Sequence, residues 1–154
     1  MRKQKGFSLI ELLIVVAIIL IIAAIAIPNL LRSRIAANEA SAVGSLRTIN
    51  TGEVTYSSTY PAIGFCDLAS LGGAGGVSTA AGLIDAVLAA GVKSGYSFTA
   101  VAAGGGGASP NTTYDGHGDP QSAQTGQRHF FSDQSGVIRY NTSGAATSTD
   151  APLQ

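Results

Sequence analysis

The first third of the chain divides into a long apolar stretch and an amphipathic one. Residues 12–27 include no polar side chain, and the wider stretch 7–31 adds only Ser8, Glu11 and Asn29. An α-helix needs about 20 predominantly apolar residues to cross the hydrocarbon core of a bilayer. The pattern therefore predicts a helix of membrane-spanning length over residues 7–31, with a single acidic side chain close to its start.

The helical pattern continues beyond the apolar stretch. Apolar residues recur at spacings of three, four and seven, which predicts an amphipathic helix over residues 32–60. Its predicted buried positions are Ile35, Ala42, Leu46, Ile49, Tyr56 and Tyr60. Pro61 is predicted to end the helix, because the residue before a proline avoids the α conformation. Pro28 lacks an N–H donor and is predicted to kink or locally open the helix near residues 24–27.

Turn residues and alternation divide the rest of the chain into short elements. Clusters of glycine, serine, threonine and asparagine mark loops, whereas alternating apolar and polar residues mark half-buried strands. The predicted elements are a loop over 62–76, a helix over 79–90, a strand over 96–101, a loop over 111–127, a hairpin over 128–140 and an exposed tail over 141–150. Together they predict an α+β fold, in which the amphipathic half of one long helix packs against a small antiparallel sheet.

A few side chains are expected to hold these elements together. Phe65, with Leu68 or Leu71, should pin the first loop to the long helix. Ser78 or Thr79 should cap the short helix, and the glycine at position 91 suits the position just after its end. The predicted aromatic core consists of Tyr56, Tyr60, Phe65, Phe98, Phe130, Phe131 and Tyr140.

The composition excludes several function classes. The chain has 154 residues, enough for one compact domain and an anchor, and its formal net charge is zero, so bulk nucleic-acid binding has no electrostatic basis. The glycine clusters are not followed by the Gly-Lys-Ser/Thr that binds phosphates, so no nucleotide site is expected. The one cysteine, Cys66, excludes a disulfide within the chain and is predicted to be a small buried apolar residue.

The polar residues form no evident catalytic or metal-binding set. Asp115, Asp119 and Asp133 lack the ligand spacing of a calcium site, so they are expected to form turns. His117 and His129 have no cysteine or histidine partner at metal-binding spacing. We therefore expect no enzyme activity, no bound metal and no cofactor.

Two roles are open for Glu11. Ser8-Leu9-Ile10-Glu11 has the form of a capping box, in which the acid accepts a hydrogen bond from the backbone at the helix start. A carboxylate inside an apolar stretch is otherwise costly unless it is paired or lies near the interface. The sequence around it decides how it is best paired.

That surrounding sequence resembles a known family. Arg2-Lys3-Gln4-Lys5-Gly6, followed by Phe7-Ser8-Leu9-Ile10-Glu11 and the apolar run, resembles the leader and N-terminus of type IV pilins. Type II secretion pseudopilins share the pattern. The resemblance implies that a prepilin peptidase cleaves between Gly6 and Phe7 and methylates the new amine of Phe7. It also implies four regions: a leader peptide 1–6, a transmembrane and filament-core half-helix 7–31, an amphipathic half-helix 32–60 and a globular head 61–154.

The resemblance implies a structural protein. Such a subunit stays in the inner membrane, with its leader cytoplasmic, until it is extracted into a helical homopolymer at the cell surface. Glu11 would pair with the Phe7 amine of a neighbouring subunit, and the segment at Pro28 would unwind in the assembled fibre. A pilus assembly ATPase and a platform protein would supply the work. Cell adhesion, motility and DNA uptake are outputs of such fibres.

Other interpretations stay open at this point. Glu39 and Glu53 are expected on a solvated helix face, or opposite basic residues of the next subunit. The chain as a whole also fits a pseudopilin of a type II protein secretion system. A membrane-anchored binding module that never polymerises is a further alternative, as is an ordinary secretory signal cleaved near residues 24–26.

Overall fold

The structure is a computed structural model that describes residues 6–106 and 109–153. Apart from Gly6, the predicted leader peptide therefore lies outside the described residues. The chain divides into two compact units, Met1–Arg34 and Ile35–Gln154. Helix α1 (Leu9–Thr59) contributes residues to both of them.

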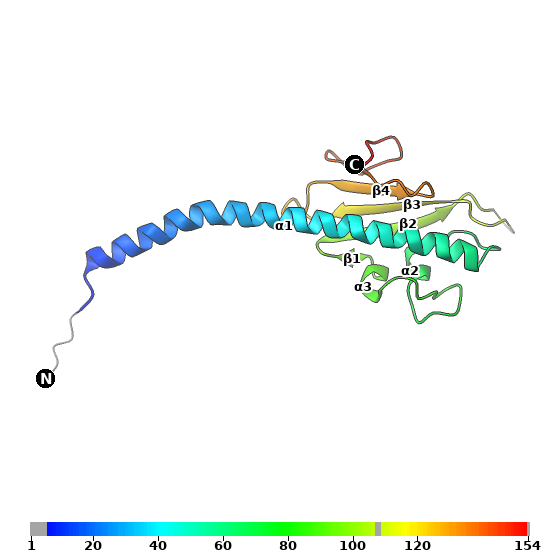
Figure 1. Cartoon of the computed structure of the whole chain (residues 1–154), viewed down its shortest axis with the longest axis horizontal. Helices are drawn as coiled ribbons and strands as arrows, with labels where there is room; N and C mark the ends of the chain where they lie inside the picture. Colours follow the sequence, from blue (N-terminus) through cyan, green and yellow to red (C-terminus); the bar gives the residue numbers. More distant parts are fainter. Residues whose placement is uncertain (1–5, 107–108, 154) are drawn as a thin grey trace. The chain divides into compact units, whose positions relative to one another are not determined.

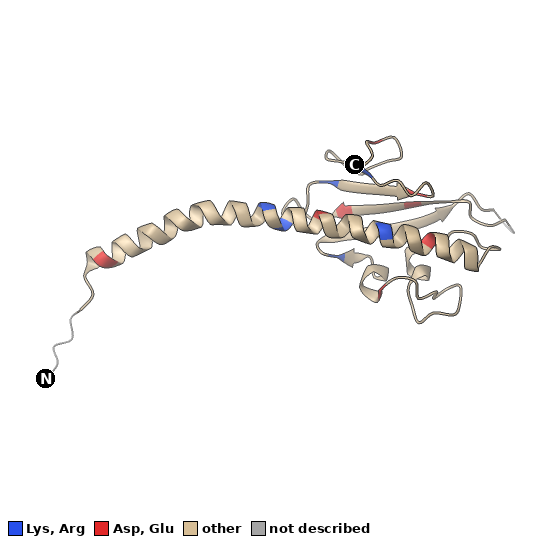
Figure 2. Ribbon diagram, viewed as in Figure 1, with Lys and Arg blue, Asp and Glu red and all other residues tan. Residues whose placement is uncertain are grey.

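The first unit contains the apolar part of α1. The sequence has no charged residue between Glu11 and Arg32, and the corresponding part of the helix is uniformly tan in Figure 2. The large apolar side chains are exposed, from 78% at Leu9 to 41% at Leu31, because nothing else in the unit covers them. Among the described residues, α1 is the one helix whose length and composition suit a membrane span, with a mean hydropathy of 3.3 in its 18-residue window.

Pro28 lies inside α1 and does not interrupt it. The chain stays α-helical on both sides of the proline (Figure 1). The helix is therefore not opened near residues 24–27 in this structure, while the predicted kink stays a prediction. A proline removes one N–H donor and crowds the preceding turn, but the residues around it keep their own backbone hydrogen bonds and hold the helix together.

In the second unit, residues 35–59 of α1 pack on one face of a five-stranded antiparallel sheet (Figure 1). The strand order is β1-β2-β3-β4-β5, so strands that follow one another in sequence also pair. The strands are β1 (Val92–Lys93), β2 (Tyr96–Ala103), β3 (Thr113–Pro120), β4 (His129–Asp133) and β5 (Arg139–Asn141). Two short helices, α2 (Leu68–Leu71) and α3 (Ala86–Ala89), lie between α1 and the sheet in sequence. The predicted α+β class is confirmed.

The core of this unit lies between helix and sheet. The predicted apolar face of α1 is buried at Ala42, Leu46, Ile49 and Tyr56, and the predicted aromatic core is buried at Phe98 and Phe130. Phe131 is buried too, but it packs on His117 on the other face of the sheet, because successive side chains of a strand alternate, so its predicted place in this core is wrong. Tyr96 and Tyr114, which the pattern did not single out, are also fully buried. Their hydroxyls donate to the Arg128 carbonyl and to Asn50 Oδ1, each at 2.9 Å. Because these polar tips are paired, the rings can be buried at little cost.

Strand β3 replaces a predicted loop. Residues 111–127 were predicted to form a loop because of their glycines and turn residues, yet Thr113–Pro120 form a strand that pairs with both β2 and β4. A Cβ added at Gly118 would lie 3.1 Å from Phe98 Cε1 and 3.5 Å from Leu46 Cδ1. The glycine therefore leaves room for the Phe98 ring of β2 beneath α1 instead of forming a turn.

The short helix is smaller than predicted. In place of residues 79–90, only Ala86–Ala89 form α3. Asp85 caps it, with Oδ1 accepting a hydrogen bond from a backbone N–H at 3.0 Å, and aspartate is a preferred N-cap. Gly82 has φ +68°, a left-handed conformation that a continuous right-handed helix cannot contain. The predicted caps at positions 78 and 79 therefore lie outside the helix.

Several packing predictions are confirmed. Leu68 and Leu71 are both buried, and they belong to α2 inside the predicted loop. Cys66 is buried with 5% of its surface exposed. Gly91 follows the C-cap of α3 at φ +79°, as expected of a residue just past a helix end.

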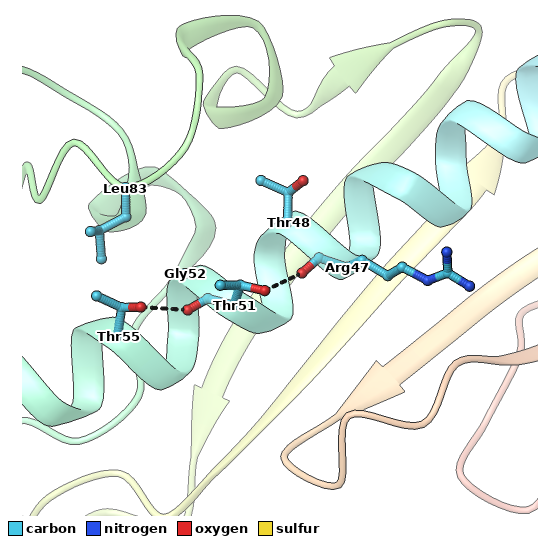
Figure 3. Close-up of a pocket in the computed structure, with 6 residues that line it drawn as sticks. All are labelled: Arg47, Thr48, Thr51, Gly52, Thr55 and Leu83. Atoms are coloured by element: carbon cyan, nitrogen blue, oxygen red, sulfur yellow. Dashed lines mark hydrogen bonds between the residues drawn. The ribbon is translucent and has the colours of Figure 1, made fainter.

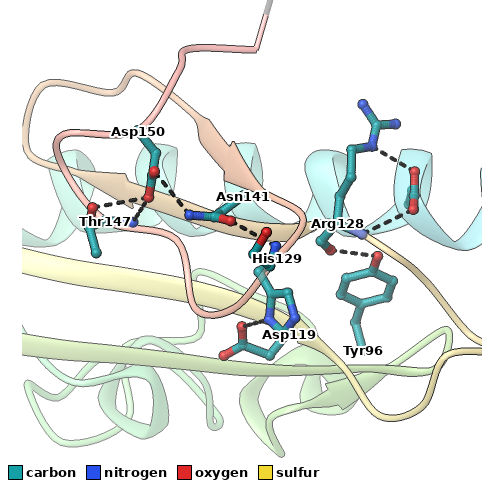
Figure 4. Close-up of polar contacts among 9 residues, drawn as sticks. Tyr96, Asp119, Arg128, His129, Asn141, Thr147 and Asp150 are labelled. Carbon is teal, nitrogen blue, oxygen red and sulfur yellow. Dashed lines mark hydrogen bonds and ion pairs between the residues drawn. The ribbon is translucent and has the colours of Figure 1, made fainter.

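The C-terminal part matches the predicted hairpin in outline. β4 and β5 pair with Phe130 opposite Tyr140, and residues 134–138 connect the two strands. Most of the tail over 141–150 is exposed, as expected, but Ala146 is fully buried. Asp150 holds this tail in place, because its carboxylate accepts hydrogen bonds from Asn141 and Thr147 (Figure 4).

Candidate functional site

The residues that the sequence marks for processing and assembly lie in two places. Gly6, Phe7 and Glu11 lie within six residues at the start of α1, whereas Pro28 lies far along the same helix. Residues 6–8 precede the helix, and the Phe7 side chain is 78% exposed. The peptide bond between Gly6 and Phe7 therefore lies outside the helical hydrogen-bond ladder.

The Glu11 carboxylate forms one half of the predicted capping box. Its Oε2 accepts a hydrogen bond from the Ser8 backbone N–H at 2.9 Å. This bond satisfies one of the donors that a helix start leaves unpaired. Because Glu11 is exposed, the carboxylate remains accessible to a second partner.

An exposed apolar surface surrounds the first half of α1. It consists of Leu9, Ile10, Leu12, Leu13, Ile14, Val15, Val16, Ile18, Ile19, Leu20, Ile21, Ile22, Ile25, Ile27, Leu30 and Leu31. Contiguous apolar surface of this extent marks a contact with a membrane or with another protein. A helix that is apolar on every side needs lipid or other helices around its whole circumference.

Glu39 is buried, so the expected solvated or intermolecular position is wrong. It is 6% exposed, and Oε1 accepts the backbone N–H groups of Gln127 at 2.9 Å and Arg128 at 3.2 Å. Oε2 accepts Arg128 Nε at 2.7 Å (Figure 4). The Arg128 guanidinium also lies 5.6 Å from the Phe130 ring centroid and 5.7 Å from that of Tyr140. Glu39 therefore ties α1 to the segment before β4 within one molecule.

Glu53 is fully buried, which corrects the same expectation at a second position. Its Oε2 accepts the Cys66 backbone N–H at 3.1 Å, while Oε1 has no hydrogen-bond partner among the described residues. Burial raises the pKa of Glu53 to about 7, the Cys66 hydrogen bond opposes the shift, and the charge of Asp67 adds to it. Segment 61–67 and the sheet cover the side of α1 that carries this acid.

The spacing of Glu39 and Glu53 along the helix indicates that both lie on its buried face. Glu39 precedes Ala42 by three residues, and Glu53 lies between Ile49 and Tyr56 at spacings of four and three. These are the intervals of the buried stripe itself. The polarity of the two glutamates indicated a solvated face, whereas their positions along the helix indicated the buried face.

The acids and histidines of the sheet do not form a metal site. Asp115 and Asp133 lie opposite one another on β3 and β4. Asp119 Oδ1 contacts His129 Nδ1 at 2.6 Å (Figure 4), and His117 packs edge-on against an aromatic ring of β4. Within the described ranges, no three histidine, cysteine, aspartate or glutamate side chains are placed to hold a metal ion.

A shallow groove of about 300 Å³ runs along an outer face of α1 (Figure 3). It is lined by Arg47, Thr48, Thr51, Gly52, Thr55 and Leu83. The Thr51 hydroxyl donates to the Arg47 carbonyl at 2.9 Å, and that of Thr55 donates to the Thr51 carbonyl at 2.8 Å. Because the helix itself uses these hydroxyls, the groove presents no nucleophile paired with a base.

Parts of this sequence match known proteins. Residues 1–27 match the family described as "Prokaryotic N-terminal methylation motif". Over 39 residues the chain is 67% identical to the "Type IV wide pilus major component PilA4" of Thermus thermophilus, covering 25% of this chain and 30% of that protein. Over 54 residues it is 43% identical to the "Type IV major pilin protein PilA" of Myxococcus xanthus, covering 35% and 24%. No solved structure matches the chain.

The matches thus span less than a third of either relative. The family match covers the start of α1 with its apolar run and includes none of the sheet. The chain thus carries the N-terminal methylation motif and is similar, over part of its length, to two type IV pilins.

Proposed function

We propose that the chain is a structural subunit that polymerises into a type IV pilus. The observation that carries the proposal is the exposed apolar half of α1, most of which lies within the N-terminal methylation motif of residues 1–27. In the membrane, lipid covers this helix. In a fibre, the same surface is covered by equivalent helices of other subunits, so polymerisation can replace one apolar environment by another at small cost.

Processing comes first in this proposal. A prepilin peptidase cleaves between Gly6 and Phe7 and methylates the Phe7 amine. The non-helical, exposed chain at residues 6–8 supports this step, because a peptidase binds an extended segment more readily than a helix. The mature protein then consists of a half-helix 7–31 in the membrane, an amphipathic half-helix 32–60 and a head 61–154.

Glu11 guides docking in the growing fibre. Cleavage leaves a positively charged amine on Phe7, one helical turn before an acid. At a separation of about 4 Å and an effective dielectric of about 20, pairing with a neighbour's amine gains about 4 kcal/mol before desolvation. Its larger effect is on register, because a misplaced subunit leaves a buried charge unpaired. The remaining interface consists of aliphatic side chains that specify little.

Pro28 supplies a weak point in the helix. It donates no backbone hydrogen bond, so the turn before it has one bond fewer to break when the fibre is stretched. The unstretched helix is continuous here. Opening near residues 24–27 under load is therefore a property that we propose for the fibre only.

The surroundings of the subunit follow from the same proposal. The precursor is held in the inner membrane by residues 7–31, with its leader on the cytoplasmic side, as the three basic residues before the span favour. A pilus assembly ATPase and a platform protein extract it into a fibre at the cell surface. The fibre itself then serves contact with surfaces or movement.

Mass spectrometry of fibres sheared from cells tests the proposal. We expect this chain as a main component, beginning at residue 7 with a methylated Phe7. Cells that make the protein with a substitution of Gly6 are the control, and they should keep the leader and form no fibre. A chain found only as a monomer that retains Met1 would contradict polymerisation and favour an anchored binding module.

A further inference from the structure

Segment 61–67 connects the end of α1 to α2 and is bound on two sides. On the sheet side it is held by Asn111, which donates from its backbone N–H to the Ile63 carbonyl at 2.7 Å and from Nδ2 to the Phe65 carbonyl at 2.9 Å. The Phe65 N–H donates back to the Asn111 carbonyl at 3.1 Å, and Asp67 Oδ1 accepts the Ala102 N–H at 3.1 Å. This side therefore has four hydrogen bonds.

On the helix side the segment depends on one carboxyl group. Ile63 and Gly64 donate to the Tyr60 carbonyl where the helix ends. Along the side of α1, in the part of the chain that the structure describes, the bond from the Cys66 N–H to Glu53 Oε2 is the one hydrogen bond between this segment and the helix. The second oxygen of Glu53 is buried and has no partner among the described residues. A fully buried carboxylate with half of its hydrogen-bonding capacity unmet is strongly disfavoured as an anion.

The groups that face Glu53 make its ionisation still less favourable. They are Tyr56 on α1, Cys66 and Asp67 on the covering segment, and Tyr114 on β3. All of them are acids, and none can neutralise a negative charge. The buried ion pair that stabilises Glu39 has no counterpart here.

We propose that protonation of Glu53 keeps segment 61–67 docked on α1, and that loss of this proton detaches the segment, hydrates the carboxylate and exposes the Cys66 thiol. A cavity of about 300 Å³ borders the segment and is lined in part by Tyr56, Cys66 and Asn111, so the segment has space into which it can move. The head thus has a conformational response to pH that the sequence alone did not predict. This inference concerns the head and does not depend on the proposed polymerisation.

The size of the response follows from linkage. The Glu53 pKa is about 7 in the closed state, against an ordinary 4.5 once the carboxyl is hydrated. Raising the pH from about 4.5 to about 7 therefore increases the equilibrium constant for opening by roughly a hundredfold or more. Below that interval both states are protonated and the segment stays docked.

Amide hydrogen exchange of the full chain in detergent micelles tests the proposal. The protection factor of the Cys66 amide should fall at least tenfold between about pH 5 and about pH 8. In Glu53→Gln the fall should disappear, because the amide cannot ionise. Glu39→Gln is the matched control on the same helix, and it should keep the fall. Constant protection in the unmodified chain, or the same fall in Glu53→Gln, would overturn the proposal.

A second measurement covers the case in which Glu53→Gln does not fold. The carboxyl carbon shift of Glu53, followed by NMR in the unmodified chain, reports its ionisation directly. The midpoint of that titration should coincide with the loss of Cys66 protection and with a rise in Cys66 alkylation. Separate midpoints, or a Glu53 carboxyl that ionises fully below pH 5, would refute the mechanism.

Discussion

Arg128 donates from Nε to Glu39 Oε2 at 2.7 Å and so joins the segment before β4 to the middle of α1. The acid is nearly inaccessible, with 8% of its side chain exposed, whereas 37% of the arginine side chain is exposed. Two backbone N–H groups complete the coordination of the carboxylate. An ion pair of this kind is best regarded as a structural tie, because each partner satisfies the other at the edge of the core.

Replacing Glu39 by alanine should therefore destabilise the folded head. The change leaves two backbone donors and one guanidinium without their acceptor, and such losses cost about 2–4 kcal/mol together. Urea unfolding of the full chain in detergent, followed by circular dichroism, measures the effect. Arg47→Ala, at an exposed position of the same helix, is the control and should change the free energy of unfolding by less than about 0.5 kcal/mol.

Glu53→Gln should change how stability depends on pH. The pKa of Glu53 is raised in the folded state, from 4.5 to about 7, so folding favours the protonated form. The contribution of Glu53 to the stability of the unmodified head should thus be largest below about pH 4.5, fall by up to about 3 kcal/mol as the pH rises through about 7, and change no further above it. The variant should lack this slope. Unfolding curves collected at several pH values would contradict the assignment if both proteins showed the same slope.

Gly126→Ala tests the packing around Tyr96. A Cβ at position 126 would lie 2.6 Å from Tyr96 Cζ, and this ring is fully buried with its hydroxyl bound to the Arg128 carbonyl. Because the ring cannot move aside, we expect a loss of about 1–3 kcal/mol. Gly44→Ala has nothing within 4 Å and lies inside α1, so it should stabilise the chain by about 0.5–1 kcal/mol. Equal effects of the two substitutions on the thermal midpoint would contradict the packing argument.

Glu11→Gln separates the two roles of this acid. Glutamine keeps an oxygen that accepts the Ser8 N–H, so the helix start should remain intact. It removes the charge that we propose to pair with the Phe7 amine of a neighbour. We expect unchanged helix content by circular dichroism and a loss of at least about tenfold in the yield of sheared fibres, corresponding to about 1.4 kcal/mol or more. Normal fibre yield would show that capping is the main role.

Local sequence was enough to predict the position and length of the long N-terminal helix. The apolar run, the capping box at Ser8 and Glu11 and the stop at Pro61 all act within a few residues, so the helix was predicted nearly to its observed ends. The apolar stripe of residues 42, 46, 49 and 56 was also predicted, because residues on one face of a helix recur every three or four positions in the sequence.

The tertiary structure alone decided which polar and glycine residues the core would accept. Gly118 was predicted to form a turn, but in the sheet it leaves room for the Phe98 ring of β2. Glu39 was predicted to be solvated, but Arg128, in the segment before β4, binds it. Glu53 was enclosed by a segment that follows it by a dozen residues. In each case the deciding contact joins residues distant along the chain. Hydrophobic pattern reports which face of an element prefers the core, but not which partner will satisfy a polar group once that face is covered.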